Sequence, residues 1–286
     1  MNKNSKIGIL ALLLVGGAIL LGGYALFSVA SSLGTEFYFL DVGQGDSELI
    51  EISDRDQKIQ ILIDAGPSER IINELSKILA FNDRYIDVLI LTHPQLDHFG
   101  GFLDVIDKYE VGIFISPGRV GESKSYQFLI DKIVKNNIPV IALGEGDRIT
   151  IGGVQLQILG PNIDELRSGE VNDASIVFRI DTGKVSALFT GDIGEATEER
   201  LVKKYDLKSD LLKISHHGSR FSSSQNFLAE VNPSLAVFEV GKNSYGHPSK
   251  IITDRLEKIS TRFLKTIESG TMKVIERDGI LRAIKL

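Results

Sequence analysis

The sequence predicts an α/β protein in which strands and helices alternate around layered sheets. Short apolar runs rich in Val, Ile and Leu recur along the chain, and longer amphipathic segments separate them. Several of these runs end in a cluster of His, Asp and Gly residues. Because ligands of layered α/β proteins bind beyond the carboxyl ends of the strands, these clusters predict one shared functional edge.

The composition is that of a globular protein with one large domain. The chain has 286 residues, of which 43% are hydrophobic and 24% are charged, so it can bury a sizeable core. The net charge of -6 disfavours a broad basic surface, and any nucleic-acid contact would be local. Scattered basic residues are usually solvated, but four lie near the later motifs and could form a local patch: Lys213, Arg220, Lys242 and Lys250. The lack of cysteine excludes disulfides, thiolate metal sites and a cysteine nucleophile.

The amino-terminal segment predicts a membrane anchor. Two lysines precede residues 7–29, about 23 uncharged residues, which is long enough to cross a bilayer as a helix. The basic flank favours a cytoplasmic amino terminus and an extracytoplasmic domain. A cleaved signal peptide is the alternative, since small residues occupy 28–30, and the protein would then be secreted; the apolar run exceeds the usual length for such a peptide. We therefore expect a single-pass cell-membrane protein, with residues 1–34 as anchor and linker and 35–286 as the folded domain.

The elements of the folded domain follow from the same patterns. In the first half, strands are expected over 36–42, 48–52, 59–63, 88–91, 111–116 and 139–143, and helices over 68–79 with Ser68 as cap, from about 100, and over 126–135. Residues 147–159 predict a hairpin around Gly152-Gly153. In the second half, strands are expected over 176–180, 185–190, 211–214 and 235–240, a helix over 195–205, and a purely structural hairpin over 273–284.

Candidate metal ligands follow the strand at 88–91. His93, Asp97 and His98 stand close together in the loop, and imidazole and carboxylate groups are typical ligands of divalent ions. Polar loops of this composition also occur without a metal. The other histidines favour the metal interpretation, because His216, His217 and His247 all lie in loops that follow apolar runs.

These residues resemble a known family. The loop from His93 to His98 resembles the HxHxDH signature of the metallo-β-lactamase superfamily, with Asp192 as its later single aspartate and His247 as its last histidine. Four further motifs are similar to the lactamase-type domain of the ComEC competence (DNA-internalisation) proteins: Asp-Val-Gly-Gln-Gly-Asp-Ser at 41–47, Leu-Ile-Asp-Ala-Gly at 62–66, Ser-His-His-Gly-Ser at 215–219 and Tyr-Gly-His-Pro at 245–248. The resemblance covers nearly everything from Glu36 onward.

The resemblance implies a four-layer αββα sandwich and hydrolysis of a phosphoryl or acyl centre by a metal-activated water. It implies one or two divalent ions, Zn or Mn, with Asp97, His98 and His247 around one position, and His93 and Asp192 contributing to the other. The expected ligands are His93, Asp97, His98, Asp192, His216 and His247, with Asp97 and His217 as candidates for catalysis. The expected substrate-binding residues are Gln44, Asp46, Ser47, Asn172, Ser175, Ser219 and Lys242.

Two departures from the family pattern affect the first metal position. Gln95 stands where the superfamily has its second histidine, and Asn172-Asp173 fall where the next ligand is expected. Glutamine is a poor ligand for such ions, so Asp173 or His216 would complete the shell, or a single ion would bind. Of His216 and His217, one would be a ligand or proton donor and the other would contact the substrate.

Three functions remain open on the sequence. The first is an extracytoplasmic, metal-dependent phosphodiesterase or nuclease related to the ComEC proteins, acting on DNA or another phosphodiester. The second is another metallo-hydrolase, acting on an ester, a lactone or a cell-envelope phosphodiester, and the acidic charge balance fits such substrates. The third is a non-catalytic metal-binding module with a degenerate site. The oligomeric state is not set by the sequence.

Overall fold

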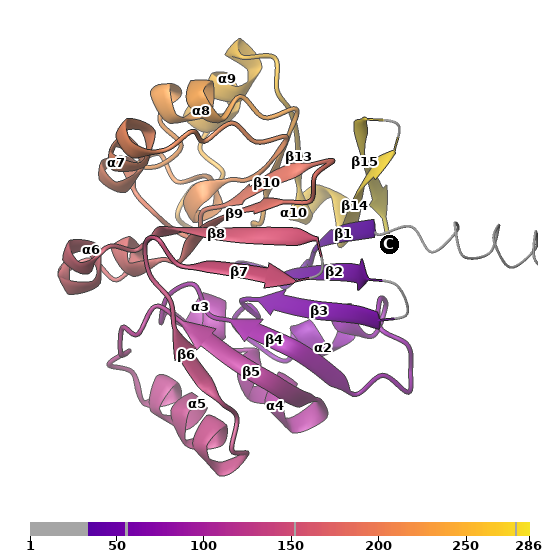
Figure 1. The fold of residues 1–286 in the computed structure, drawn as a ribbon. Helices are drawn as coiled ribbons and strands as arrows, with labels where there is room; N and C mark the ends of the chain where they lie inside the picture. Colours follow the sequence, from indigo (N-terminus) through magenta and orange to yellow (C-terminus); the bar gives the residue numbers. More distant parts are fainter. Residues whose placement is uncertain (1–33, 55–56, 152, 278) are drawn as a thin grey trace, which may run out of the picture.

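The computed structural model describes residues 34–54, 57–151, 153–277 and 279–286, and it contains two sheets with helices on their outer faces (Figure 1). The predicted membrane segment at 7–29 lies outside these residues. Within the described part of the chain, no helix has the length and apolar character needed to cross a bilayer.

The first sheet has eight strands in the order β15-β14-β1-β2-β3-β4-β5-β6. Strands β1, β2 and β3 pair antiparallel, whereas β3 to β6 run parallel, as in a sheet built partly from crossover units. The strands are β1 Gly34–Phe39, β2 Glu48–Asp54, β3 Gln57–Ile63, β4 Tyr85–Ile90, β5 Glu110–Ser116, β6 Val140–Ala142, β14 Met272–Arg277 and β15 Ile280–Lys285.

The second sheet has seven strands in the order β13-β12-β11-β10-β9-β8-β7. Strands β10 to β13 are parallel, and β7 to β10 are antiparallel. The strands are β7 Arg148–Ile151, β8 Val154–Gly160, β9 Val177–Asp181, β10 Ser186–Phe189, β11 Leu211–Lys213, β12 Leu235–Phe238 and β13 Arg262–Lys265.

Three apolar layers hold the fold together. The central layer fills the space between the sheets, where the Phe178 and Phe189 rings stack with centroids 4.9 Å apart. One outer layer packs the first sheet against α2 Arg70–Leu75, α4 Phe102–Lys108 and α5 Lys124–Lys135. The other packs the second sheet against α7 Glu195–Lys204, α8 Gln225–Val231 and α9 Lys250–Lys258. The two sheets and the helices outside each of them make four layers, which confirms the predicted αββα sandwich (Figure 1).

Short helices complete the connections: α3 Leu96–Phe99, α6 Ile163–Arg167, α10 Thr266–Ser269, and the 3-10 turns η1 Asn172–Ala174 and η2 Ser215–Gly218. The helix expected over 68–79 is shorter than predicted, and Ser68 is not its cap, since Glu69 occupies that position without a capping side-chain bond. The prediction omitted α8, α9 and β13. Strands β3, β4, β10, β11 and β12 end at one edge of the two sheets, where the predicted site residues follow.

Candidate metal centre

The loop after β4 places two imidazoles in the interior and one carboxylate at the surface. The rings of His93 and His98 are fully buried, with centroids 4.1 Å apart. Helix α3 begins at Leu96, so Asp97 and His98 occupy its first turn, where a carboxylate is favourable. The Asp97 side chain is 33% exposed, and its carboxylate is therefore open to a ligand or a solvent molecule.

Asp64, at the end of β3, orients His98. Its carboxylate accepts hydrogen bonds from the Thr92 backbone N–H at 2.8 Å and from the Thr92 hydroxyl at 2.6 Å. His98 Nδ1 lies 2.7 Å from Asp64 Oδ2, so this nitrogen carries the proton and Nε2 is left for another partner. Such a carboxylate behind a histidine is the usual support of a metal ligand. The motif at 62–66 contains Asp64, but its sequence alone does not indicate this supporting role.

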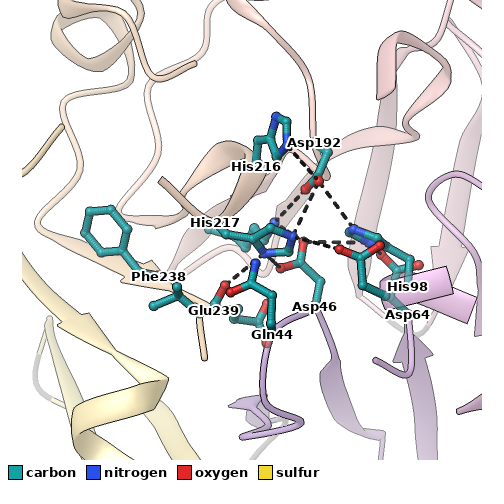
Figure 2. Close-up of polar contacts among 12 residues, drawn as sticks. Gln44, Asp46, Asp64, His98, Asp192, His216, His217, Phe238 and Glu239 are labelled. Atoms are coloured by element: carbon teal, nitrogen blue, oxygen red, sulfur yellow. Dashed lines mark hydrogen bonds and ion pairs between the residues drawn. The ribbon is translucent and has the colours of Figure 1, made fainter. Parts of the chain in front are cut away.

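Asp192, which follows β10, directs one oxygen toward three histidines (Figure 2). Its Oδ2 lies 3.4 Å from His98 Nε2, 3.5 Å from His217 Nε2 and 3.7 Å from His216 Nε2. The Ser175 hydroxyl accepts a hydrogen bond from the Asp192 backbone N–H at 3.1 Å, which fixes the loop. Asp192 is therefore the carboxylate around which the centre is assembled.

The turn η2 presents His216 and His217 in an uncommon backbone conformation. Their φ angles are 49° and 52°, in the left-handed region that non-glycine residues rarely adopt and that often occurs at functional sites. His217 Nδ1 donates to the Glu239 carbonyl at 2.9 Å, so its Nε2 faces Asp192 and lies 3.5 Å from Asp97 Oδ2. The backbone geometry thus directs both imidazoles into the centre.

The donor atoms fit a divalent cation. The Nε2 atoms of His93, His98 and His217 and both carboxylate oxygens of Asp192 are buried without a hydrogen-bond partner among the described residues. Unpaired buried polar atoms are costly, and several pointing at one place indicate a group that satisfies them. Among the described residues, five sets of three side chains have ligand atoms that all lie within 4.8 Å of one another, and two of these sets are His93, His98 and Asp192, and Asp97, His98 and His217. Histidine and carboxylate ligands of this kind suit a divalent metal.

The remaining predicted ligands are placed less directly. Gln95 Nε2 donates to Asn172 Oδ1 at 2.5 Å, and Asn172 Nδ2 lies 3.5 Å from the His216 ring nitrogens, so the two amides bond to each other beside the centre. Asp173 accepts from the Ser168 hydroxyl at 2.6 Å and belongs to none of the ligand clusters among the described residues, so its suggested part in the shell stays a prediction. His247 lies close by, with its ring centroid 5.6 Å from that of His216, and its part as a ligand stays a prediction.

The charges within the centre favour metal binding. Burial alone would lower the pKa of His217, but the Asp192 and Asp46 carboxylates outweigh it and raise the pKa to about 10. Burial also opposes the charged form of His98, and the carboxylates of Asp192 and Asp64 raise its pKa well above the ordinary value. Burial and the neighbouring His98 lower the pKa of His93 to about 3. In the absence of a cation, the neighbouring carboxylates therefore keep the imidazoles of His98 and His217 protonated. A metal that binds to these imidazoles would displace the protons.

A buried ionic cluster lies directly behind the centre. Lys213, which was expected among the surface bases, is fully buried because β11 runs between two other strands and directs its side chain inward. Its Nζ pairs with Asp46 Oδ2, lies 3.1 Å from the Gly191 carbonyl and 3.8 Å from Asp192 Oδ1. Burial raises the pKa of the adjoining Glu48 to about 8. The carboxylates of Asp46, Glu48 and Glu239 lie within 4.8 Å of one another. The Lys213 ammonium pairs with this cluster through Asp46, so a positive charge is present there without a metal ion.

The predicted substrate-binding residues divide into two groups. Asp46, Ser47 and Ser175 are buried, and they support the site instead of facing a substrate: Asp46 pairs with Lys213 and His217, the Ser47 hydroxyl donates to the Asp64 carbonyl, and Ser175 holds Asp192. Ser219 is largely buried but lines a groove beside the centre, so its part in substrate binding stays a prediction. Gln44 and Asn172 line the opening of the centre, and Lys242 is exposed.

Two adjoining grooves lead to the centre. A groove of about 440 Å³ opens over Asp97, His216 and His217. A second groove, of about 550 Å³, shares His216, Tyr245 and His247 with the first and extends over Arg220 and Lys250. The centre is therefore open to a substrate larger than a water molecule.

Comparison with known proteins agrees with this geometry. Residues 40–238 match the family model described as the metallo-beta-lactamase superfamily. ComE operon protein 3 of Bacillus subtilis is 28% identical over 83% of this chain and 32% of its own length, and competence protein ComA of Neisseria gonorrhoeae is 31% identical over 84% of this chain and 32% of its own. The chain thus spans about a third of these relatives.

A solved structure shows the same fold. The metallo-beta-lactamase fold protein YhfI from Bacillus subtilis superposes with a TM-score of 0.55 at 12% identity, over 87% of this chain and all of YhfI. The fold, the cluster of donor atoms and the family match agree. This chain belongs to the metallo-β-lactamase superfamily and is a metal-dependent hydrolase related to the competence proteins.

Proposed function

We propose that this hydrolase is a phosphodiesterase that cleaves nucleic acid outside the cytoplasm, with Zn or Mn as its metal. The observation that carries the proposal is the convergence of three imidazole nitrogens on Asp192 Oδ2, at 3.4 to 3.7 Å, beneath an open groove. A divalent cation bound there supplies a water of lowered pKa and a positive charge beside the scissile group.

The protein's own residues supply the remaining parts of the chemistry. Asp97 is 33% exposed and Asp192 is 1% exposed, so Asp97 is the carboxylate that a water in the groove can contact. Burial opposes its charged form, but the bond to His217 and the charge of His98 lower its pKa, so it meets the groove as an anion that can orient such a water. Asp64 keeps His98 in one tautomer, and the Glu239 carbonyl does the same for His217. These supports keep the ligand atoms in place before a substrate arrives.

Two observations favour a phosphodiester over a carboxylic ester. The second groove presents Arg220 and Lys250 beside the centre, and cationic side chains match the charge of a phosphate backbone. A matched relative is named a competence protein. An extracytoplasmic location is supported by the uncharged run at 7–29 and the lysines that precede it.

The activity is tested by a substrate panel with the purified full chain. Hydrolysis of a generic phosphodiester, a DNA strand, a carboxylic ester and a lactone is measured with Mn, with Zn and with a chelator. We expect phosphodiester cleavage that the chelator abolishes and that Asp192→Asn lowers by at least a hundredfold, as loss of a group acting on the transition state does. Asp107→Asn is the matched control, since Asp107 is an exposed carboxylate of α4 that pairs with Lys132. Faster cleavage of the ester or lactone, or cleavage that survives chelation, would refute the proposal.

The location is tested separately. A reporter enzyme that is active only outside the cytoplasm is fused after Leu286 and its activity is measured in whole cells. A signal equal to that of an exported control supports the extracytoplasmic site, and a signal equal to that of a cytoplasmic control contradicts it.

A further inference from the structure

The second groove carries two exposed aromatic side chains beside the metal centre. Phe221 is 73% exposed and Tyr245 is 75% exposed, so the apolar rings of both residues are in contact with solvent. Single exposed aromatic residues are common on protein surfaces. These two differ because both line one groove, which also contains His216 and the adjoining His247.

The loop that carries Tyr245 is held by a single side chain. Asn243 Oδ1 accepts from the backbone N–H groups of Tyr245 and His247, both at 3.1 Å, and its Nδ2 donates to the Gly241 and His247 carbonyls at 2.9 and 2.8 Å. Four bonds to one amide fix the course of the chain. The ring of Tyr245 is therefore presented to solvent by an ordered loop.

The segment that carries Phe221 is fixed in a similar way. The Phe221 carbonyl accepts from the Glu195 N–H at 3.0 Å, and Arg255 Nη1 donates to the Ser222 and Ser223 carbonyls at 3.2 and 2.9 Å. The two aromatic loops are also joined to each other, since the Ser249 N–H donates to the Gly218 carbonyl at 2.8 Å. The rings thus stand on one preformed wall.

The charge of this groove differs from that of the whole protein. The chain has a net charge of -6, yet the described residues that line the groove include Arg220 and Lys250 and no Asp or Glu. Lys250 is paired with Asp254 in a salt bridge at 2.6 Å, but its side chain is 85% exposed and free to exchange that exposed partner for a phosphate. The groove combines aromatic faces with positive charge.

We propose that Phe221 and Tyr245 are stacking platforms for the unpaired bases of a single-stranded nucleic acid, whose phosphates contact Arg220 and Lys250 on the way to the metal centre. The inference deepens the proposed function by naming its substrate as single-stranded. Aromatic rings next to cationic groups are the general means of binding single strands, because every base has a face that can stack. A duplex keeps its bases stacked inside and offers these rings no partner.

The test is a binding measurement, so it does not depend on turnover. Fluorescent DNA and RNA single strands and a DNA duplex are titrated with the full chain in the presence of a chelator, and anisotropy gives the dissociation constants. Phe221→Ala and Tyr245→Ala should each weaken single-strand binding by about fivefold or more, while Trp at either position retains it. Phe81→Ala and Phe128→Ala are matched controls, since both rings are exposed elsewhere and should leave affinity unchanged.

The outcomes separate this inference from the proposed function. Equal affinities for Phe221→Ala and Phe81→Ala would overturn the stacking role, as would equal weakening of single-strand and duplex binding. Binding to vesicles with anionic phospholipid that is lost in Phe221→Ala, with strand binding unchanged, would mean that the rings face a membrane instead. If the protein hydrolyses no phosphodiester but the aromatic variants lose strand binding, the proposed function fails and the single-strand groove stands.

Discussion

Asp46 Oδ1 lies 3.0 Å from His217 Nδ1, while its other oxygen pairs with the buried ammonium of Lys213. The contact joins an ion pair in the interior to an imidazole whose Nε2 faces the metal centre. Asp46 therefore acts on the centre from behind, through the orientation and charge of His217.

Asp46→Asn should weaken metal binding by about 10- to 100-fold, because it removes a carboxylate that holds and polarises a candidate ligand. The dissociation constants for Mn and Zn are measured with a competing chelator dye. Asp87→Asn is the control, as this partly buried carboxylate accepts from the Gln60 N–H within the first sheet, away from the centre. Unchanged metal affinity in Asp46→Asn would show that the contact with His217 has no functional effect.

Lys213→Met should lower the free energy of unfolding by about 3–5 kcal/mol, since the buried charge of Asp46 then keeps only His217 as a partner. The double variant Asp46→Asn, Lys213→Met should be less destabilised than Lys213→Met alone, because both charges are then gone. Urea denaturation of the four proteins gives the coupling energy. Additive effects would indicate that the two groups do not interact.

Glu48→Gln should stabilise the protein increasingly as the pH rises from about 5 to about 8. Burial raises the pKa of folded Glu48 to about 8, whereas the unfolded group ionises near its ordinary value. Between these values unfolding releases a proton, so the wild-type protein loses stability as the pH rises and the glutamine variant does not. Melting temperatures are compared at both ends of this range. A difference in melting temperature between Glu48→Gln and the wild-type protein that stays constant with pH would contradict the raised pKa. Glu110→Gln is the control, because Glu110 is exposed.

Gly218→Ala should disturb the centre as well as the fold. Gly218 has φ of +84°, and a Cβ there would lie 2.7 Å from Pro248 Cβ and 2.8 Å from the Phe238 ring. Gly183 has φ of +75° with no atom within 4 Å of such a Cβ, so Gly183→Ala isolates the backbone strain of about 1–2 kcal/mol. We expect both variants to have a lower melting temperature than the wild-type protein. Isothermal titration should show weaker metal binding in Gly218→Ala only. Normal metal affinity in Gly218→Ala would mean that the two loops adjust independently.

Much of the fold followed from the sequence because its strands are short apolar runs bounded by turn residues. The strand at 88–91 and the clusters after it were found in this way, and the carboxyl-edge rule brought His93, Asp97, His98 and Asp192 together correctly. Helix α9 was missed because Lys250–Lys258 is short and strongly charged, and its apolar face depends on Ile252 and Leu256 alone.

The roles of Lys213 and Asp46 were not predictable from the pattern. A lysine at the end of an apolar run reads as a surface residue, and only the pairing of β11 between β10 and β12 shows that its side chain is enclosed. Asp46 was expected to meet a substrate, whereas it is buried beneath the centre. Its burial results from contacts with Lys213 and His217, which are distant in the sequence.

Locating the bound metal is the most direct test of the proposed centre. Crystals of the full chain grown with Mn or Zn, with anomalous diffraction recorded at the absorption edge of the metal, would locate the ion without any assay. We predict an anomalous peak within ligand distance of His98 Nε2, Asp192 Oδ2 and either His93 or His217, and its loss in Asp192→Asn. A peak among Asp46, Glu48 and Glu239 instead, or no peak at either place, would contradict the assignment of the centre.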